Sequence, residues 1–329
     1  MEKILIIGIG LIGGSVARNV GKVYALDKSR ENLDAAGEFL IKGYQSLDQV
    51  DIEPDVIVIC VPVSVAIAMA PKLKERFGNS IFIDCCSTKR SIEAAYNGVN
   101  YAGMHPMAGS EGSGFEHSRK ELFGGASMCI TGSGEAAQYA YSLAERLGGK
   151  PIYIDSVSHD SAVATVSHLP HIIAGALCLT AEQQCSKVDK TALLAAGGFA
   201  DITRIADSDP DMWGAIFSDN ADMVLECLDD FQQCLAKWRE LLIKADEQEL
   251  KEYFALCKKS KQSFKAVTKG IFPKDGVRGF IACKQEDVPQ YSEAAMRMGA
   301  EGVFRASDGI TVVCKTCDEL AKISAELCK

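Results

Sequence analysis

A short apolar run at the start of the chain leads directly into a glycine-rich loop. The run Lys3–Ile7 is followed by Gly8-Ile9-Gly10-Leu11-Ile12-Gly13 and then by a segment that favours a helix. In such a loop Gly8 allows a tight turn, Gly10 lets the backbone approach a pyrophosphate, and Gly13 lets helix and strand pack closely. The free N–H groups at the helix start then face the phosphates. The loop therefore predicts a Rossmann-type dinucleotide site.

A second apolar run makes this prediction more specific. Lys22–Leu26 is typical of a buried strand and ends at Asp27, nineteen residues after Gly8, where a ribose-binding acid is expected. A carboxylate at this place accepts hydrogen bonds from ribose hydroxyls and repels a 2′-phosphate. Lys28 and Arg30 partly offset that repulsion. We therefore expect NAD rather than NADP as the cofactor.

Strand and helix patterns continue to alternate up to about residue 155, which predicts an α/β domain with a parallel sheet. Ligands of such sheets bind at the carboxyl ends of the strands. Val61 and Pro62 end one expected strand and should approach the cofactor. Two further motifs follow expected strands, and we place both in loops at the same edge: Cys85–Lys89 after Ser80–Asp84, and His105–Gly109 after Tyr101–Met104.

Beyond residue 155 the pattern becomes helical. Ser158–Gln184 is expected to form one long helix. Apolar residues then recur at spacings of three and four, as in an amphipathic helix, at Val224, Leu228, Phe231, Leu235, Trp238 and Leu242. This stripe suits either the core of a helical domain or the interface of a dimer, and the pattern does not separate the two.

The last part of the chain has a βαββα pattern. We expect strands at Arg278–Cys283, Gly302–Arg305 and Ile310–Cys314, with a hairpin turn at Asp308-Gly309, and helices at Val288–Met298 and Asp318–Cys328. This order is similar to a small ligand-sensing domain, although a structural appendage fits equally well. The predicted domains are thus a Rossmann domain (1–155), a helical substrate and dimerisation domain (156–272) and a small α+β tail (273–329).

Composition excludes several classes of function. The net charge of −9 argues against a nucleic-acid partner, because phosphate binding needs a basic surface. We find no uninterrupted apolar run of about 18 residues, and the chain enters its first strand at once, so we expect neither a membrane span nor a signal peptide. Thirteen cysteines without a small-scaffold spacing are typical of reduced thiols in a cytoplasmic protein. Cys314 and Cys317 lack a second pair nearby, so no metal site is expected.

Several motifs in register resemble the prephenate/arogenate dehydrogenase family of tyrosine biosynthesis. The resemblance covers about residues 1–270. It rests on Gly8–Gly13, Asp84–Lys89, His105–Glu111, Ser167–His171, Gly197–Arg204 and Asp209–Trp213.

The resemblance implies a reaction and two catalytic residues. The family oxidises and decarboxylates prephenate to 4-hydroxyphenylpyruvate with NAD. For this chain we also expect a homodimer formed through the helical domain. His105 matches the family's catalytic histidine, and a neutral imidazole is a suitable proton acceptor near neutral pH. Ser87 matches the serine that shares the hydrogen bond to the substrate hydroxyl.

Five further residues are expected to bind substrate. Arg204 matches the family's substrate arginine, and its guanidinium suits a carboxylate. His171 is expected as a second contact, His168 as lining or support, Asp201 as a partner that orients a cation, and Ser110 as a contact from the His105 motif. Three alternatives stay open: an arogenate-specific enzyme, a β-hydroxyacid dehydrogenase or imine reductase, and a non-catalytic NAD sensor.

Overall fold

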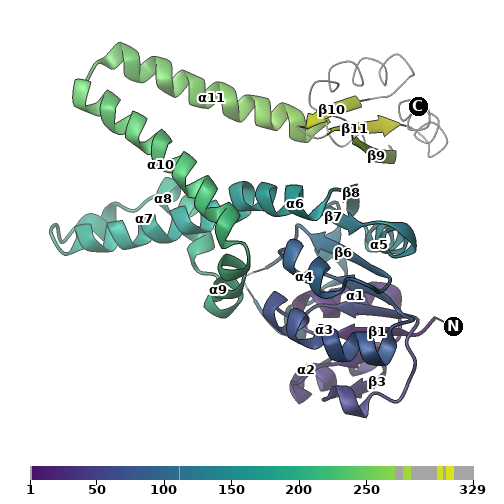
Figure 1. Ribbon diagram of the computed structural model, residues 1–329. Coiled ribbons are helices and arrows are strands. Elements are labelled where there is room, and N and C mark those ends of the chain that lie inside the picture. Colours follow the sequence, from purple (N-terminus) through teal and green to yellow (C-terminus); the bar gives the residue numbers. More distant parts are fainter. Residues whose placement is uncertain (1, 111, 271–276, 283–301, 307–308, 315–329) are drawn as a thin grey trace. The chain divides into compact units, whose positions relative to one another are not determined.

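The computed structural model describes residues 2–110, 112–270, 277–282, 302–306 and 309–314 (Figure 1). The chain forms two compact units, residues 1–229 and residues 230–329. The first unit contains an eight-stranded sheet and the first part of the helical region. The second contains the end of one long helix, another long helix and a three-stranded sheet. This α/β Rossmann fold followed by helices confirms the predicted fold class.

The eight-stranded sheet is mainly parallel, and it places the glycine loop near its middle. Its strand order is β3 (Leu40–Tyr44), β2 (Val23–Leu26), β1 (Ile4–Ile7), β4 (Val56–Ile59), β5 (Ile81–Asp84), β6 (Tyr101–Pro106), β7 (Ser127–Gly132) and β8 (Lys150–Tyr153). The first six strands are parallel, whereas β7 runs antiparallel to β6 and β8 follows the direction of β7. The carboxyl ends of β1, β4, β5 and β6 therefore lie along one edge.

Both faces of this sheet are covered by helices, which explains the continuous apolar runs of its central strands. On β1, Ile4 and Ile6 belong to one buried cluster, whereas Leu5 and Ile7 belong to another. The first cluster includes residues of α1 (Leu11–Val20), α2 (Arg30–Ala35) and α5 (Gly134–Arg146). The second includes residues of α3 (Val63–Phe77) and α4 (Arg90–Ala95).

Strand β6 is longer than the sequence indicated. We expected it to end at Met104 and to release His105 and Pro106 into a loop, and this expectation is wrong. The strand continues through Pro106 because its last residues pair with β7, where His105 lies opposite Cys129. A strand position fixes the backbone of His105 more firmly than a loop would.

The expected long helix is continuous but contains an irregular turn. It consists of α6 (Ser156–Val163), a π-helical turn over Ala164–His168 and α7 (Leu169–Cys185). Pro170 lies in the first turn of α7; it lacks an N–H and its ring crowds the carbonyl four residues earlier, which interrupts regular hydrogen bonding. The wider turn therefore falls where Ser167 and His168 lie.

Two more helical segments complete the first unit. α8 (Gly197–Thr203) runs into a short 3₁₀ turn, Arg204–Ala206, and α9 (Pro210–Asp219) follows. The Asp209 side chain caps α9 by accepting from the Met212 N–H at 2.9 Å. Further 3₁₀ turns lie at Gly37–Phe39, Leu47–Gln49, Phe115–His117, Lys120–Phe123 and Thr191–Leu194.

In the second unit, α11 (Glu247–Gly270) follows α10 (Ala221–Lys244), whose first residues belong to the first unit. Trp238 contacts Tyr253 edge to face at a centroid distance of 4.9 Å. The tail strands are β9 (Val277–Ala282), β10 (Gly302–Ala306) and β11 (Gly309–Cys314), and β11 pairs antiparallel with both others. The predicted helices at 288–298 and 318–328 lie outside the described residues.

The helical run Ser156–Cys185 is long and apolar enough to cross a membrane by length and composition alone. Its polar residues, however, form hydrogen bonds within the folded unit. Asp160 accepts from the backbone of Lys89 and Arg90, and the ring of His159 bonds to that of His105. These bonds tie the start of the run to the sheet domain, and we regard the run as part of the folded unit.

Candidate active site

A cavity of about 1070 Å³ begins at the glycine loop. Gly10, Leu11 and Ile12 line it, as do Val61 and Pro62 at the end of β4. The glycines fit a dinucleotide cradle. A Cβ on Gly13 would stand 2.0 Å from the Gly8 carbonyl oxygen, whereas a Cβ on Gly10 would meet nothing closer than 3.9 Å. Gly13 thus serves close packing, and Gly10 leaves space at the helix start where a pyrophosphate would lie.

Asp27 directly follows β2, as expected for a ribose-binding acid. Its two carboxylate oxygens accept backbone N–H groups, one from Ile9 at 2.8 Å and one from Ser29 at 2.8 Å. Asp27 therefore ties the glycine loop to the end of β2. Each oxygen still has a lone pair left for a ribose hydroxyl.

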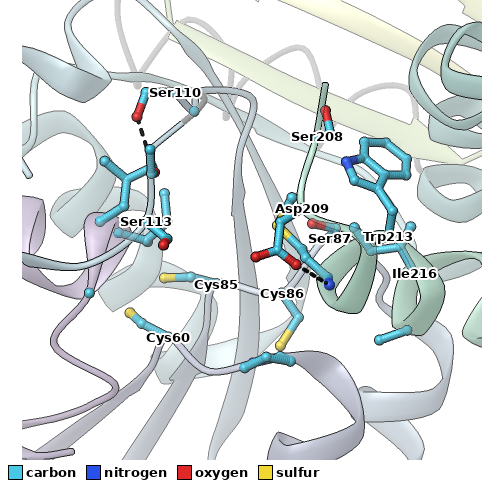
Figure 2. A pocket seen from close by; sticks show the side chains of 18 of the residues that line it. Cys60, Cys85, Cys86, Ser87, Ser110, Ser113, Ser208, Asp209, Trp213 and Ile216 are labelled. Carbon is cyan, nitrogen blue, oxygen red and sulfur yellow. Dashed lines mark hydrogen bonds between the residues drawn. The ribbon is translucent and has the colours of Figure 1, made fainter. Parts of the chain in front are cut away.

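Ser87 lies on the cavity wall, in the loop after β5 (Figure 2). A buried ion pair holds this loop. The Lys89 ammonium donates to Asp84 at 2.6 Å and to the Cys86 carbonyl at 2.8 Å, and Tyr101 donates to the other Asp84 oxygen at 2.6 Å. Burial opposes the charge of Lys89, but the neighbouring carboxylate of Asp84 raises the pKa of Lys89 above its usual value. A fixed positive charge thus lies directly behind the Ser87 loop.

His105 lies at the end of β6, next to β5, and is only 8% exposed. It is not part of the cavity lining described above. Its Nδ1 lies 2.9 Å from Nε2 of His159, and His159 Nδ1 lies 2.8 Å from Asp160 Oδ1. Burial, helped by the positive charge of Lys89, holds the pKa of His105 well below its usual range. His105 is therefore neutral at neutral pH and is able to accept a proton.

The pair His159-Asp160 was missed by sequence reasoning. Both residues lie on α6, and both are almost fully buried. Although burial opposes ionisation, hydrogen bonds from His159 and from the Arg90 N–H lower the pKa of Asp160. The one available signal was an adjacent histidine and aspartate near the start of a long helical run, which has no specific meaning without the fold.

Arg90 connects the sheet domain to the helical region of the same unit. Its guanidinium donates to Asp160 at 3.3 Å, to Asn220 at 3.2 Å and to both oxygens of Asp222, at 2.8 and 2.6 Å. Asn220 in turn donates to the Asp160 carbonyl at 2.8 Å and lies 3.2 Å from His168 Nδ1. These bonds fix α6 and α9 against the start of α4.

The opposite wall of the cavity comes from the helical region. Arg204 and His171 line it, as expected for substrate contacts. Trp213 lines it too, although it was not among the substrate residues expected from the sequence. The rings of His171 and Trp213 stack at a centroid distance of 3.5 Å, and His171 Nδ1 bonds to the Ser167 carbonyl at 2.8 Å. The aromatic stack gives the wall a flat apolar face beside a cation.

The other expected substrate residues occupy different positions. Ser110 lines the cavity from the loop after β6 (Figure 2). His168 is buried behind the wall, edge-on to Trp213, so it fits the supporting role that we expected. Asp201 is exposed on α8 and is not among the residues that line the cavity.

A cofactor cradle and a cationic helical wall around one cavity, with a neutral buried imidazole on a neighbouring strand, define a Rossmann-type dehydrogenase. Two family models match the sequence: the nucleotide-binding domain of prephenate dehydrogenase over residues 12–153, and the prephenate dehydrogenase dimerization domain over residues 155–256. The chain therefore belongs to the prephenate dehydrogenase family.

Individual relatives agree with this assignment. Prephenate dehydrogenase from Lactococcus lactis is 32% identical over 294 residues, which span 83% of this chain and 80% of the relative. A solved prephenate dehydrogenase from Aquifex aeolicus, in complex with hydroxyphenyl propionate and NAD⁺, has a TM-score of 0.74 and 31% identity over 80% of this chain and 98% of its own. Arogenate dehydrogenase from Synechocystis has a TM-score of 0.67 and 25% identity over 80% of this chain and 99% of its own. These matches support NAD as the cofactor. They include prephenate dehydrogenases and an arogenate dehydrogenase, so they do not decide between these two substrates.

Proposed function

We propose that the chain catalyses the NAD-dependent oxidative decarboxylation of prephenate to 4-hydroxyphenylpyruvate. The observation that carries the proposal is that one cavity is lined by the glycine loop on one side and by Arg204 on the other. Its volume of about 1070 Å³ is large enough for a dinucleotide together with a small dicarboxylate. The family membership and the named relatives point the same way.

The reaction balances without an outside base. The ring carbinol loses its C–H hydrogen with two electrons and its O–H proton, and the bond to the ring carboxylate breaks to release CO₂. The bound dinucleotide supplies the two-electron oxidant. The aromatic product needs a phenolic proton, so the proton taken from the alcohol is available to return to the same oxygen. A buried residue that holds one proton reversibly is therefore sufficient.

His105 is the proposed proton acceptor, and Ser87 is the proposed partner on the cavity wall. The low pKa of His105 keeps its imidazole neutral, so the ring is ready to accept the proton at neutral pH. Ser87 is partly exposed to the cavity and holds the substrate hydroxyl beside that ring. Because β5 and β6 are parallel neighbours, their carboxyl ends bring Ser87 and His105 to the same edge.

Substrate orientation is proposed to come from the helical wall. Arg204 pairs with a carboxylate of prephenate, and the stacked rings of His171 and Trp213 contact the cyclohexadiene ring. Ser110 completes the polar lining, and His168 supports the aromatic stack from behind. Asp201, whose side chain is exposed on α8, is proposed to orient a cation of this wall.

We further propose that the protein is a cytoplasmic homodimer formed through its helical domain. The family model for the helical part describes a dimerization domain. Large apolar side chains on α10 and α11 are at least half exposed in the single chain, among them Leu235, Leu242, Ile243, Phe254 and Leu256. Such a concentration is typical of surfaces that pack against a second subunit. The role of the tail stays a prediction.

The proposed function is tested by steady-state kinetics with prephenate and arogenate, each with NAD and with NADP. We expect prephenate with NAD to give the highest kcat/KM, together with release of CO₂ and the reduced dinucleotide. His105→Asn should lower kcat by roughly 10²–10⁴-fold with a modest change in KM, because proton transfer is lost while the binding groups remain. His117→Asn replaces an exposed histidine and is the matched control.

Each alternative outcome has a definite meaning. Turnover of arogenate alone would replace prephenate as the substrate. Absence of turnover with either substrate, in a protein that still binds NAD, would overturn the proposed function. Undiminished turnover in His105→Asn would overturn the assignment of the base.

A further inference from the structure

We propose that Asp160 is a positioning residue that acts through His159 to set the tautomer of His105, so that Nε2 of His105 is left free to accept the substrate proton. The inference deepens the proposed function and rests on the role of His105 given above. It starts from a chain of two hydrogen bonds, His105 Nδ1 to His159 Nε2 at 2.9 Å and His159 Nδ1 to Asp160 Oδ1 at 2.8 Å.

The direction of every bond in this chain follows from its carboxylate end. An ionised carboxylate accepts hydrogen bonds and cannot donate one, so His159 must donate from Nδ1. A neutral histidine has one ring proton, which leaves His159 Nε2 as an acceptor. His105 must then donate from Nδ1, and its own Nε2 carries a free lone pair. The carboxylate thereby fixes the protonation of a ring with which it has no contact.

The surroundings of Asp160 keep it ionised and immobile. Its Oδ1 also accepts the Lys89 N–H at 2.8 Å, and its Oδ2 accepts the Arg90 N–H at 2.9 Å and Arg90 Nε at 3.3 Å. Asp160 is 1% exposed. These donors come from the start of α4, about 70 residues earlier in the chain. Because they bond to both oxygens, the carboxylate has a fixed orientation.

Several titratable groups lie near the two rings, and burial outweighs those that favour the charged form. Lys89 faces His105 and His159 from the loop after β5, Asp84 faces His159 from the end of β5, and His168 faces His105 from the π-helical turn. Burial is the largest influence on both rings, and it lowers the pKa of His159 as well as that of His105. Two neutral rings in series transmit the orientation of a proton without a buried positive charge.

The same contacts predict what an amide does in place of the carboxylate. If Asp160→Asn places its NH₂ group at the Oδ2 position, that group faces two donors, the backbone and side chain of Arg90. At the Oδ1 position it faces one obligate donor, the Lys89 N–H, because His159 is able to become an acceptor by moving its proton to Nε2. One clash costs less than two. His159 then donates to His105 Nδ1, and the proton of His105 moves to Nε2.

The experiment reads these tautomers directly. In protein labelled with ¹⁵N at histidine, long-range ¹H–¹⁵N NMR spectra without substrate distinguish Nδ1–H from Nε2–H rings. We expect Nδ1–H for both His105 and His159 in the wild type, and Nε2–H for both in Asp160→Asn. The variant's kcat should fall roughly 10²–10⁴-fold with KM and NAD affinity nearly unchanged, since the analogous loss of a carboxylate behind a catalytic histidine has an effect of this size.

Asp222→Asn is the matched control, because Asp222 bonds to the same Arg90 but makes no bond to His159. It should keep the wild-type tautomers, and its kcat should stay within about twofold, as expected for an exposed ion pair. An Nε2–H tautomer for His105 in the wild type would overturn the inference, even if Asp160→Asn does not fold. The NMR result requires no substrate, so its failure is distinguishable from a failure of the prephenate assay.

Discussion

Acid should destabilise the protein through His168. This side chain is 1% exposed, and its ring lies edge-on to Trp213 and Phe217. Its Nδ1 lies 3.2 Å from the amide nitrogen of Asn220 and must accept from it, because the amide nitrogen is only a donor. Burial lowers the pKa of His168 from 6.5 to about 4. Protonation of the folded protein therefore requires loss of this bond as well as burial of a charge.

The size of the effect follows from linkage. The unfolded chain binds a proton on this histidine below a pH of about 6.5, whereas the folded chain does so only near 4, so stability falls as the pH falls through this window. The full difference is on the order of 3 kcal/mol, of which roughly 2 kcal/mol is lost between about pH 7 and pH 5. Burial also lowers the pKa of His105, His159 and His171, so these residues add losses of the same sign.

Urea unfolding at a series of pH values, at one protein concentration, measures this loss. A comparison of the wild type with His168→Gln isolates the contribution of His168. We expect the decrease in the free energy of unfolding from pH 7 to pH 5 to be smaller in the variant by roughly 2 kcal/mol. His117→Gln is the control, since it removes an exposed histidine. Equal decreases in the wild type and His168→Gln would refute the reasoning, as would an NMR titration in which His168 of the folded protein gains its proton near pH 6.5.

Two further predictions concern binding. Gly10→Ala should leave the thermal stability of the unliganded protein nearly unchanged yet weaken NAD binding by at least about tenfold, because the added Cβ lies no closer than 3.9 Å to a neighbouring protein atom but occupies the pyrophosphate space. Gly13→Ala, the control, should instead lower the melting temperature. Tight NAD binding by Gly10→Ala in a fluorescence titration would contradict this account. Arg204→Ala should raise the KM for prephenate roughly 10–100-fold with a small effect on kcat, as expected for loss of one charge-assisted contact, and an unchanged KM would exclude Arg204 as the carboxylate anchor.

The sheet was readily predicted because its signals are local. Four-residue runs such as Ile4–Ile7 and Val56–Ile59 are apolar throughout, as strands covered on both faces must be. The glycine loop and Asp27 also have meaning within a short window. The end of β6 was not predictable in this way, because a proline is uncommon inside a sheet and only pairing with β7 extends β6 as far as Pro106.

The helical wall shows a second limit of sequence reasoning. Arg204 and His171 were expected in the site, and both line the cavity. Trp213 was not among the expected site residues, but it does two things at once: it supports the buried ring of His168 and stacks on His171 at the cavity surface. A tryptophan at helical spacing is compatible with either role. The sequence pattern does not indicate which face of the indole ring is exposed to a cavity.

The same limit applies with more force to Asp160. Near the start of a helix, an aspartate is ordinarily explained by its favourable interaction with the helix dipole, and nothing local separates that role from any other. What distinguishes Asp160 is the set of donors around it, from Lys89, Arg90 and His159, which meet only because the fold packs α6 against the start of α4. The dipole explanation predicts a loss of stability and no other change when the carboxylate is removed. The hydrogen-bond chain predicts in addition that the tautomer of His105, which is linked to Asp160 through His159, changes. A measurement of the His105 tautomer therefore distinguishes the two explanations, whereas a measurement on Asp160 itself does not.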